Sequence, residues 1–410
     1  MRLYYTDSFL YEFDGEVLEI IPASSAEPRP AVILDRTAFY PTSGGQIFDT
    51  GLLSPKSSAH NGQSTVLEVA DREDGAVLHF VDDATSIAKG NIVHGTIDAA
   101  RRRDHMQQHS GQHVLSAAFV RFFNLPTVSF HMGDDYCSID LDTKTISNEQ
   151  VEAAERLAND IILEDREVAI RFVSQEEAQS LGLRKLPPAD RDKLRLIDIR
   201  DFDLSACGGT HVRSTGQIGC ILLRKTEKTR QGIRVEFVCG QRAVGTARRD
   251  YTTLSEAAGL YSAHLWDLPQ QIRRSQEEAR ADRKTRERLL DELAEERATH
   301  LLANTPLTNG RKLIVQVFAD RDLTYIKLLA QKLTRLETNV IALLGTTAGQ
   351  LSLIFAQSPG QSFDMGAHMK QALAQLGGRG GGSKDLAQGG PHESANLQKV
   401  LADLMAQFRE

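Results

Sequence analysis

The segments His109-Ser-Gly-Gln-His113 and Cys207-Gly-Gly-Thr-His211 constrain the fold of this chain more than any other stretch. The sequence around the first segment is typical of a helix, so the two histidines, at i and i+4, lie on one face. Two central glycines in the second segment allow a bend that brings its cysteine and histidine together. Three imidazoles and one thiolate suit zinc better than magnesium or calcium. We therefore predict one Zn²⁺ ion, held by His109, His113, Cys207 and His211.

A packing role or a peptidase site would account for the same residues less well. A lone histidine or cysteine in a helix or loop is usually a packing residue, but two such pairs in one chain favour a shared metal ion. A zinc peptidase helix carries glutamate directly after its first histidine. Here that position is Ser110, and the spacer holds no acid that could act as a general base. The pattern therefore disfavours a zinc peptidase or amidase.

The composition is that of an ordinary globular chain. With 410 residues, 41% hydrophobic and 25% charged, it is long enough for two or three domains. There is no apolar run of membrane-spanning length and no signal-peptide pattern, so we expect no membrane association. Four cysteines without a disulfide framework favour the reducing cytoplasm. The net charge of -7 gives no global case for nucleic-acid binding, which must depend on local patches.

The pattern of elements predicts an α+β multidomain protein. Residues 1–95 show short alternating strands and turn clusters, which predict a small β-barrel or sandwich. Residues 96–250 predict an α+β zinc-binding domain in which a helix over 99–124 carries the histidine pair. A second, amphipathic helix is predicted over 148–166 with Ser147 as its N-cap.

The remaining sequence predicts two further parts. Residues 251–305 form a helical linker, because 270–297 contains charge but neither proline nor glycine. A solvated spacer is the favoured interpretation, and a homodimer through this arm or through the C-terminal domain is the alternative. Residues 306–410 predict a small α/β domain, with helices over 323–336, over 364–376 and after Pro391.

The loop Phe39-Tyr-Pro-Thr-Ser-Gly-Gly-Gln-Ile-Phe-Asp-Thr-Gly51 is a second marked motif. Gly44 and Gly45 favour a tight turn that displays backbone N–H groups. Gln46 adds an amide that both donates and accepts hydrogen bonds. Alone, the loop predicts only a hairpin turn.

Together with the ligand pairs, this loop makes the chain resemble the long-form AlaX-type alanyl-tRNA editing proteins, relatives of the editing half of alanyl-tRNA synthetase. The resemblance also includes Arg234-Val-Glu-Phe and the glycine run 377–390, which is similar to the synthetase's DHH-associated C-terminal domain. Many free-standing members carry a third glycine where this chain has Ser43. That departure affects only the fine geometry of the loop. The chain opens directly on the β-rich module, which resembles a free-standing editor.

The resemblance implies a trans-editing hydrolase acting on mischarged alanine tRNA. Its substrates would be serine, and also glycine, wrongly attached to that tRNA. Such a second sieve is needed because a pocket for alanine cannot strongly exclude glycine or serine. A non-catalytic, zinc-stabilised tRNA-binding or scaffold protein is the alternative.

Site residues follow from the same resemblance. Thr127, Ser129 and His131 lie on the loop where relatives contact the serine hydroxyl. Gly44, Gly45 and Gln46 would stabilise oxyanion charge or hold the terminal adenosine. The zinc ion either acts on water or substrate, or only shapes the pocket while Gln46, Gln112 or a backbone carbonyl positions the water.

Basic residues predict where RNA binds, although ordinary solvated loops carry such charges too. One group lies just before the histidine pair of the ligand helix, a second lies between two predicted strands, and a third lies within the glycine run. These residues are Arg101, Arg102 and Arg103, then Arg224, Lys225, Lys228, Arg230 and Arg234, and finally Arg379 and Lys384.

Overall fold

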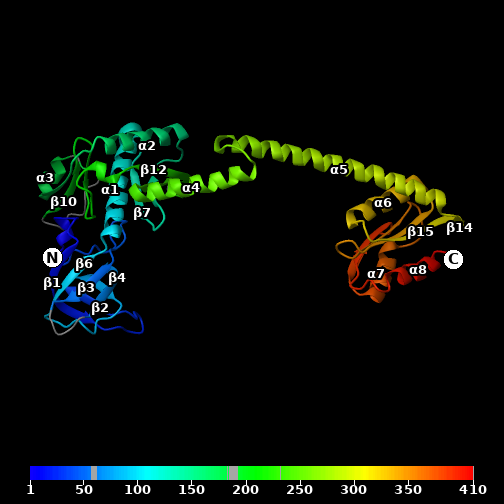
Figure 1. The fold of residues 1–410 in the computed structure, drawn as a ribbon, viewed down its shortest axis with the longest axis horizontal. Helices are drawn as coiled ribbons and strands as arrows, with labels where there is room; N and C mark the ends of the chain where they lie inside the picture. The colour runs from blue at the N-terminus through cyan, green and yellow to red at the C-terminus, as the bar shows by residue number, and fades with distance from the viewer. Residues whose placement is uncertain (57–61, 182, 184–192, 231, 410) are drawn as a thin grey trace. The chain divides into compact units, whose positions relative to one another are not determined.

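A computed structural model describes residues 1–56, 62–181, 183, 193–230 and 232–409. The chain forms two compact units, Met1–Glu256 and Ala257–Glu410 (Figure 1). Within the described ranges, no helix combines the length and apolarity needed to cross a membrane.

The N-terminal strands close into a barrel, which confirms the predicted small β-barrel. Its strand order is β1-β2-β5-β4-β3-β6. The barrel strands are β1 (Glu12–Ile21), β2 (Ala31–Leu34), β3 (Gly51–Pro55), β4 (Ser64–Asp71), β5 (Val77–Val81) and β6 (Ile92–Ile97), after a short 3₁₀ turn at Leu3–Tyr5. Alternate residues such as Phe13, Val17 and Val69 point inward and fill the barrel. The 39–51 loop connects β2 to β3 and so belongs to this barrel.

The predicted ligand helix is α1 (Ala99–Phe123), and it is the central helix of the unit. Asp98 caps its first turn by accepting hydrogen bonds from two backbone N–H groups, and Asn124 ends it in the left-handed conformation (φ 53°). Its residues from 105 to 111 are all buried. A helix buried on all sides holds its histidines away from water and in fixed positions.

Two sheets and a second long helix surround α1. The elements are β7 (Thr127–Met132), β8 (Cys137–Leu141), α2 (Asn148–Leu163), β9 (Val168–Val173), α3 (Gln175–Ser180), β10 (Leu194–Ile199), β11 (Asp203–Ala206), a 3₁₀ turn (Thr215–Ile218), β12 (Ile221–Lys228), β13 (Ile233–Cys239) and α4 (Gly240–Leu260). One sheet has the order β12-β13-β8-β7 and the other β11-β10-β9. Ser147 caps α2 through a complete capping box with Gln150, as predicted for the N-cap.

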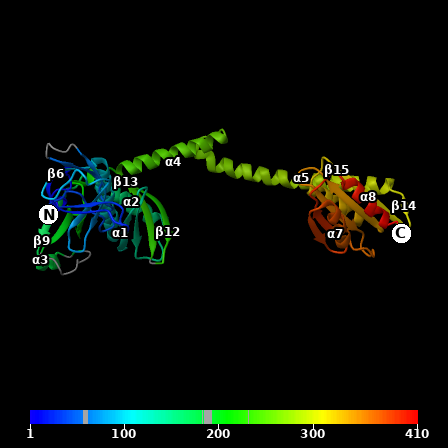
Figure 2. The same cartoon turned by 90° about the horizontal axis from the view of Figure 1, so that it is seen from below.

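The C-terminal unit is a six-stranded sheet with helices on both faces. Its elements are a 3₁₀ turn (Leu265–Asp267), α5 (Leu268–Asn304), β14 (Leu307–Thr308), β15 (Arg311–Phe318), α6 (Leu323–Leu336), β16 (Val340–Thr346), β17 (Ser352–Gln357), α7 (Met365–Leu376), β18 (Arg379–Gly382), β19 (Leu386–Gly390) and α8 (Leu397–Gln407). The strand order is β14-β15-β16-β17-β19-β18. α5 and α6 pack on one face of the sheet, and α7 and α8 on the other (Figure 1); Figure 2 views this unit from the side of α7 and α8.

The predicted helical linker, 251–305, takes in the end of α4 and all of α5, and most of α5 is exposed. Its buried residues are Leu268 near the start and Ala294, Ala298 and Leu302 near the end. The last three belong to the core of the C-terminal sheet. The helix thus has an anchored end and a solvated middle, and its pairing with a second copy stays a prediction.

The glycine run 377–390 forms two paired strands, β18 and β19. β18 and β19 pair from Arg379 opposite Gly390 to Gly382 opposite Ala387. A Cβ on Gly380 would lie 2.5 Å from the Cα of Gly389, and one on Gly389 would lie 2.7 Å from the sulfur of Met369. Glycine is needed because α7 and the neighbouring strand leave no room for side chains.

Candidate metal centre

The four predicted ligands converge. His109 and His113 come from α1, and Cys207 and His211 come from the loop after β11. One ligand atom from each lies within 4.8 Å of all the others, so the cluster could hold a metal ion. His109, His113 and His211 are buried, and Cys207 is partly buried.

The spacing inside the cluster fits a tetrahedral ion. The Cys207 sulfur lies 3.4 Å from His109 Nε2 and 3.3 Å from His211 Nε2. A tetrahedral ion with metal–sulfur and metal–nitrogen bonds of zinc length separates S and N by about 3.5 Å. The side chains are therefore close to the positions in which one small cation would hold them.

The Nδ1 atom of each imidazole also lies close to another polar group. His109 Nδ1 lies 2.7 Å from Gln46 Oε1, and His211 Nδ1 lies 3.1 Å from Ser110 Oγ. His113 Nδ1 lies 3.5 Å from a carboxylate oxygen of Asp203. Metal-bound histidines commonly pair their second nitrogen in this way, which fixes the ring and its tautomer. Ser110, which replaces the peptidase glutamate, thus orients a ligand.

Charge at the cluster favours a thiolate. Burial alone would raise the pKa of Cys207, but attraction to His109 and His211 and hydrogen bonds outweigh it and hold that pKa well below its usual value. Burial lowers the pKa of His211 to about 3. Burial also acts to lower the pKa of His113, yet Asp203 and Cys207 raise it to about 9. A bound cation would displace the proton of His113 and take the thiolate as a ligand.

The two central glycines of the second segment differ in their surroundings. A Cβ on Gly209 would lie 2.1 Å from His109 Cε1, so any side chain there would displace a ligand. A Cβ on Gly208 would come no closer than 3.6 Å to the nearest atom, the hydroxyl of Tyr5. Gly209 is therefore required by the approach of α1 to the loop.

The 39–51 loop turns tightly beside the cluster, as its glycines predict. Ser43 and Gln46 exchange two backbone hydrogen bonds across Gly44 (φ 57°) and Gly45 (φ 84°). Positive φ at both central residues defines a type I′ turn. A Cβ on Gly45 would lie 2.5 Å from the carbonyl oxygen of Phe130, so the turn packs directly on β7.

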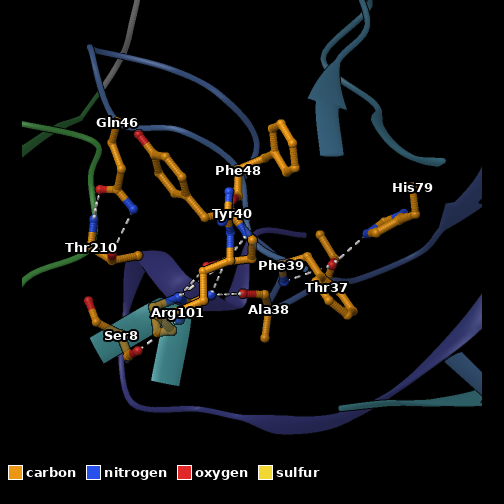
Figure 3. A network of polar contacts seen from close by, with 12 residues as sticks. Ser8, Thr37, Ala38, Phe39, Tyr40, Gln46, Phe48, His79, Arg101 and Thr210 are labelled. Atoms are coloured by element: carbon orange, nitrogen blue, oxygen red, sulfur yellow. Dashed lines mark hydrogen bonds and ion pairs between the residues drawn. The ribbon is translucent and has the colours of Figure 1, made fainter. Parts of the chain in front are cut away.

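Gln46 does not face a substrate, which corrects its predicted role toward an oxyanion or adenosine. Its side chain is fully buried. Nε2 donates to Thr210 Oγ1 at 2.8 Å, while Oε1 accepts from the backbone N–H of Thr210 at 3.1 Å (Figure 3). Oε1 also lies 2.7 Å from His109 Nδ1. Both ends of the carboxamide are therefore occupied by the ligand segments.

Arg102 is not available to RNA, which corrects a second prediction. It is fully buried and forms an ion pair with the equally buried Asp49. It also donates to the backbone carbonyls of Ser8 at 2.8 Å and Ala38 at 2.6 Å. Asp49 in turn accepts from the backbone N–H of Tyr40 at 2.7 Å. This network fastens α1 to the barrel.

The walls of a cavity of about 300 Å³ include residues next to the predicted ligands in the sequence. The cavity is lined by Gln112, Val120, Pro126, Thr127, Val128, Ser129, Phe130, Ser205 and Ala206. Gln112 and Ala206 directly precede the ligands His113 and Cys207, and the ring of Phe130 lies 5.5 Å from that of His109. Residues of β7 and the residues that precede two predicted ligands thus contribute to the cavity wall.

The predicted hydroxyl-contacting residues lie on β7, so their placement on a loop was wrong. β7 pairs with β8. The alternating pattern of residues 127–132 is too short to predict a strand. The Thr127 hydroxyl lies 2.7 Å from that of Ser116, to which Gln112 donates at 2.8 Å. Ser129 donates to Asp140 at 2.6 Å. His131 is exposed and lines a different cavity.

The other basic residues lie on the surface with differing partners. Arg101 is partly buried and donates to the backbone carbonyl of Phe48 at 3.0 Å (Figure 3). Arg224, Lys225 and Arg234 form ion pairs, with Asp250, Glu227 and Asp140 respectively. The remaining predicted residues, Arg103, Lys228, Arg230, Arg379 and Lys384, are exposed.

Sequence reasoning missed several residues that support the site. Thr210 and Ser110 lie inside the quoted motifs, and their short side chains between ligands could have indicated a supporting role. Asp203 and Asp49 carry no local signal, because each acts on a residue far away in the sequence.

Three family models match this chain, and together they define a class. Residues 11–101 match the class II (A) tRNA synthetases. Residues 194–235 match the second additional domain of threonyl- and alanyl-tRNA synthetases. Residues 310–410 match the DHHA1 domain. The chain is thus built from parts shared with alanyl-tRNA synthetases.

Individual relatives agree with these models. The chain is 30% identical to the alanyl-tRNA editing protein AlaX-L of Pyrococcus horikoshii, over 95% of this chain and 94% of that protein. It belongs to the family of AlaX-L alanyl-tRNA editing proteins.

The synthetases themselves are longer. The chain is 32% identical to the alanine–tRNA ligase of Pyrococcus furiosus over 94% of its own length but only 41% of the ligase. It spans about two fifths of the ligases that it matches. Among solved structures, the C-Ala domain of Aquifex aeolicus alanyl-tRNA synthetase matches at 18% identity, covering 26% of this chain and 99% of that chain, with a TM-score of 0.25.

Proposed function

We propose that this chain hydrolyses the ester of mischarged alanine tRNA, releasing serine, and glycine as a further substrate, at a site built on one zinc ion. The observation that carries the proposal is a hydroxyl-lined cavity whose wall includes the residues that precede His113 and Cys207, two members of the cluster of three histidines and one cysteine. Family membership supplies the class of reaction, because its relative is an alanyl-tRNA editing protein.

The cavity suits a small polar side chain. Serine differs from alanine by one hydroxyl, and a site that pairs that hydroxyl can select serine strongly. Ser129 already donates its proton to Asp140, so its oxygen is left to accept from a ligand hydroxyl. Thr127, joined to Ser116 and Gln112, offers a second polar contact.

His109, His113, Cys207 and His211 would hold the zinc ion, whose Lewis acidity polarises a carbonyl or lowers the pKa of a water. Among the described residues, the backbone N–H groups of Gly44 and Gly45 have no hydrogen-bond partner. Gly45 packs on Phe130, a residue of the cavity wall, which supports a role for this turn as donor to developing oxyanion charge. Gln112, on the cavity wall, is placed to position water.

We assign the RNA contacts to exposed basic residues that form no ion pair within the described part of the chain. Arg103, Lys228 and Arg230 are exposed in the N-terminal unit, and Arg379 and Lys384 in the C-terminal unit. Cations on the surface bind phosphates by displacing counterions. We propose these five, with Arg101, Arg224 and Lys225 contributing less because they already have partners within the protein.

Alanine tRNA charged with serine tests the proposal directly. With the protein in excess, serine should be released faster than alanine from otherwise identical tRNA. A chelator should slow serine release, and added zinc should restore it. Release of both amino acids at equal rates, or tight tRNA binding without release, would contradict the proposal, and the second outcome would favour a non-catalytic tRNA-binding protein.

A further inference from the structure

The carboxamide of Gln46 links the barrel to both ligand segments. It lies on the 39–51 loop, yet its polar contacts are with Thr210, between two ligands, and with His109 on α1. Gln46 is fully buried, as is Thr210. A buried amide with every contact on metal-ligand segments is placed to control those segments.

The hydrogen bonds fix which way the amide faces. The backbone N–H of Thr210 can only donate, so the atom 3.1 Å from it must be the carboxamide oxygen of Gln46. Nε2 then points at Thr210 Oγ1, which accepts. The orientation of Gln46 therefore follows from the chemistry of its partner.

That orientation determines the tautomer of His109. The same oxygen lies 2.7 Å from His109 Nδ1, and an oxygen without a proton can only accept. His109 must therefore carry a proton on Nδ1, so Nε2, the atom that faces the Cys207 sulfur, is the ring nitrogen left to bind a cation. Gln46 thus prepares His109 to bind a cation through Nε2.

We infer that Gln46 is a positioning residue. It fixes the metal-binding tautomer of His109, and it links the position of the 39–51 loop of the barrel to the affinity for the metal ion. This inference rests on the proposed function, in that the cation is the zinc ion of that site. Gln46 does not contact the substrate. Its effect passes through His109 and Thr210 alone.

Two substitutions separate its acceptor role from its packing. Gln46→Met keeps the shape but removes the acceptor, and should weaken zinc affinity about 10- to 100-fold, as loss of a supporting hydrogen bond to a ligand commonly does. Gln46→Glu keeps an acceptor for His109 and for the Thr210 N–H, and should bind zinc at or above wild-type affinity. Gln108→Met is the matched control, because Gln108 is equally buried in α1 but bonds Asp104 and Cys239.

Competition with a chromophoric chelator measures these affinities in the full-length protein. Equal zinc affinity of wild type and Gln46→Met would overturn the inference. The inference would also be overturned if Gln46→Glu weakened zinc binding as much as Gln46→Met does. The same holds if Gln108→Met weakened it equally, because packing would then explain the effect.

The tautomer itself can be measured without metal or mutation. In ¹⁵N spectra of zinc-free wild-type protein, His109 should show a proton on Nδ1, the nitrogen that faces Gln46 Oε1. A proton on Nε2 instead would overturn the inference even if Gln46→Met fails to fold. Because this measurement involves neither zinc nor tRNA, its outcome is independent of whether the chain deacylates tRNA.

Discussion

Replacement of Cys207 by alanine is expected to lower zinc affinity by more than about a hundredfold and to abolish zinc-dependent serine release. Loss of a group that merely supports a ligand already costs 10- to 100-fold, and here a ligand itself is removed. Cys207 is also the only thiolate in the cluster, and it contacts two of the three imidazoles. Zinc titration and the serine-release assay check this expectation.

Cys220→Ala is the matched control for that substitution. Cys220 is also partly buried and free, but it lies outside the cluster. It should leave both zinc affinity and serine release at wild-type values. Full zinc binding by Cys207→Ala would show that the ion is held elsewhere.

Replacement of Arg102 by methionine is expected to destabilise the N-terminal unit by about 3–5 kcal/mol. Asp49 would remain fully buried without its counterion, and removal of one partner from a buried pair typically costs that much. The carbonyls of Ser8 and Ala38 would lose their donor as well. Scanning calorimetry of the full chain should show a lower midpoint for one unfolding transition, the one that zinc raises.

Arg103→Ala is the control that tests whether the loss of stability depends on the buried position of Arg102. Arg103 is the exposed neighbour of Arg102, and its loss should change stability by less than about 0.5 kcal/mol. Arg102→Met combined with Asp49→Asn should recover part of the loss, since no unpaired charge remains buried. If Arg102→Met were as stable as Arg103→Ala, the ion pair would not hold α1 to the barrel.

The convergence of the four candidate metal ligands could be predicted from the sequence because their spacing carries the geometry. In His109 and His113 the helical period places both rings on one face, and the fold had only to supply the second pair. The barrel, the capped helix α2 and the C-terminal α/β unit followed from equally local patterns.

The buried ion pair of Arg102 could not be predicted from charge alone. Helix geometry does argue against an RNA surface that contains three adjacent arginines. Successive helical residues point about 100° apart, so three adjacent arginines cannot share one surface. The structure leaves Arg101 partly buried, Arg102 buried and Arg103 exposed. The role of Gln46 was missed for another reason, since its partner Thr210 lies 164 residues away.

X-ray absorption at the zinc edge of the metal-loaded protein tests the central claim most directly, namely that two distant segments share one ion. We expect one sulfur at about 2.3 Å and three nitrogens at about 2.0–2.1 Å, with the sulfur lost in Cys207→Ala. A spectrum of wild-type protein without sulfur, or one with two or more sulfurs, would contradict it.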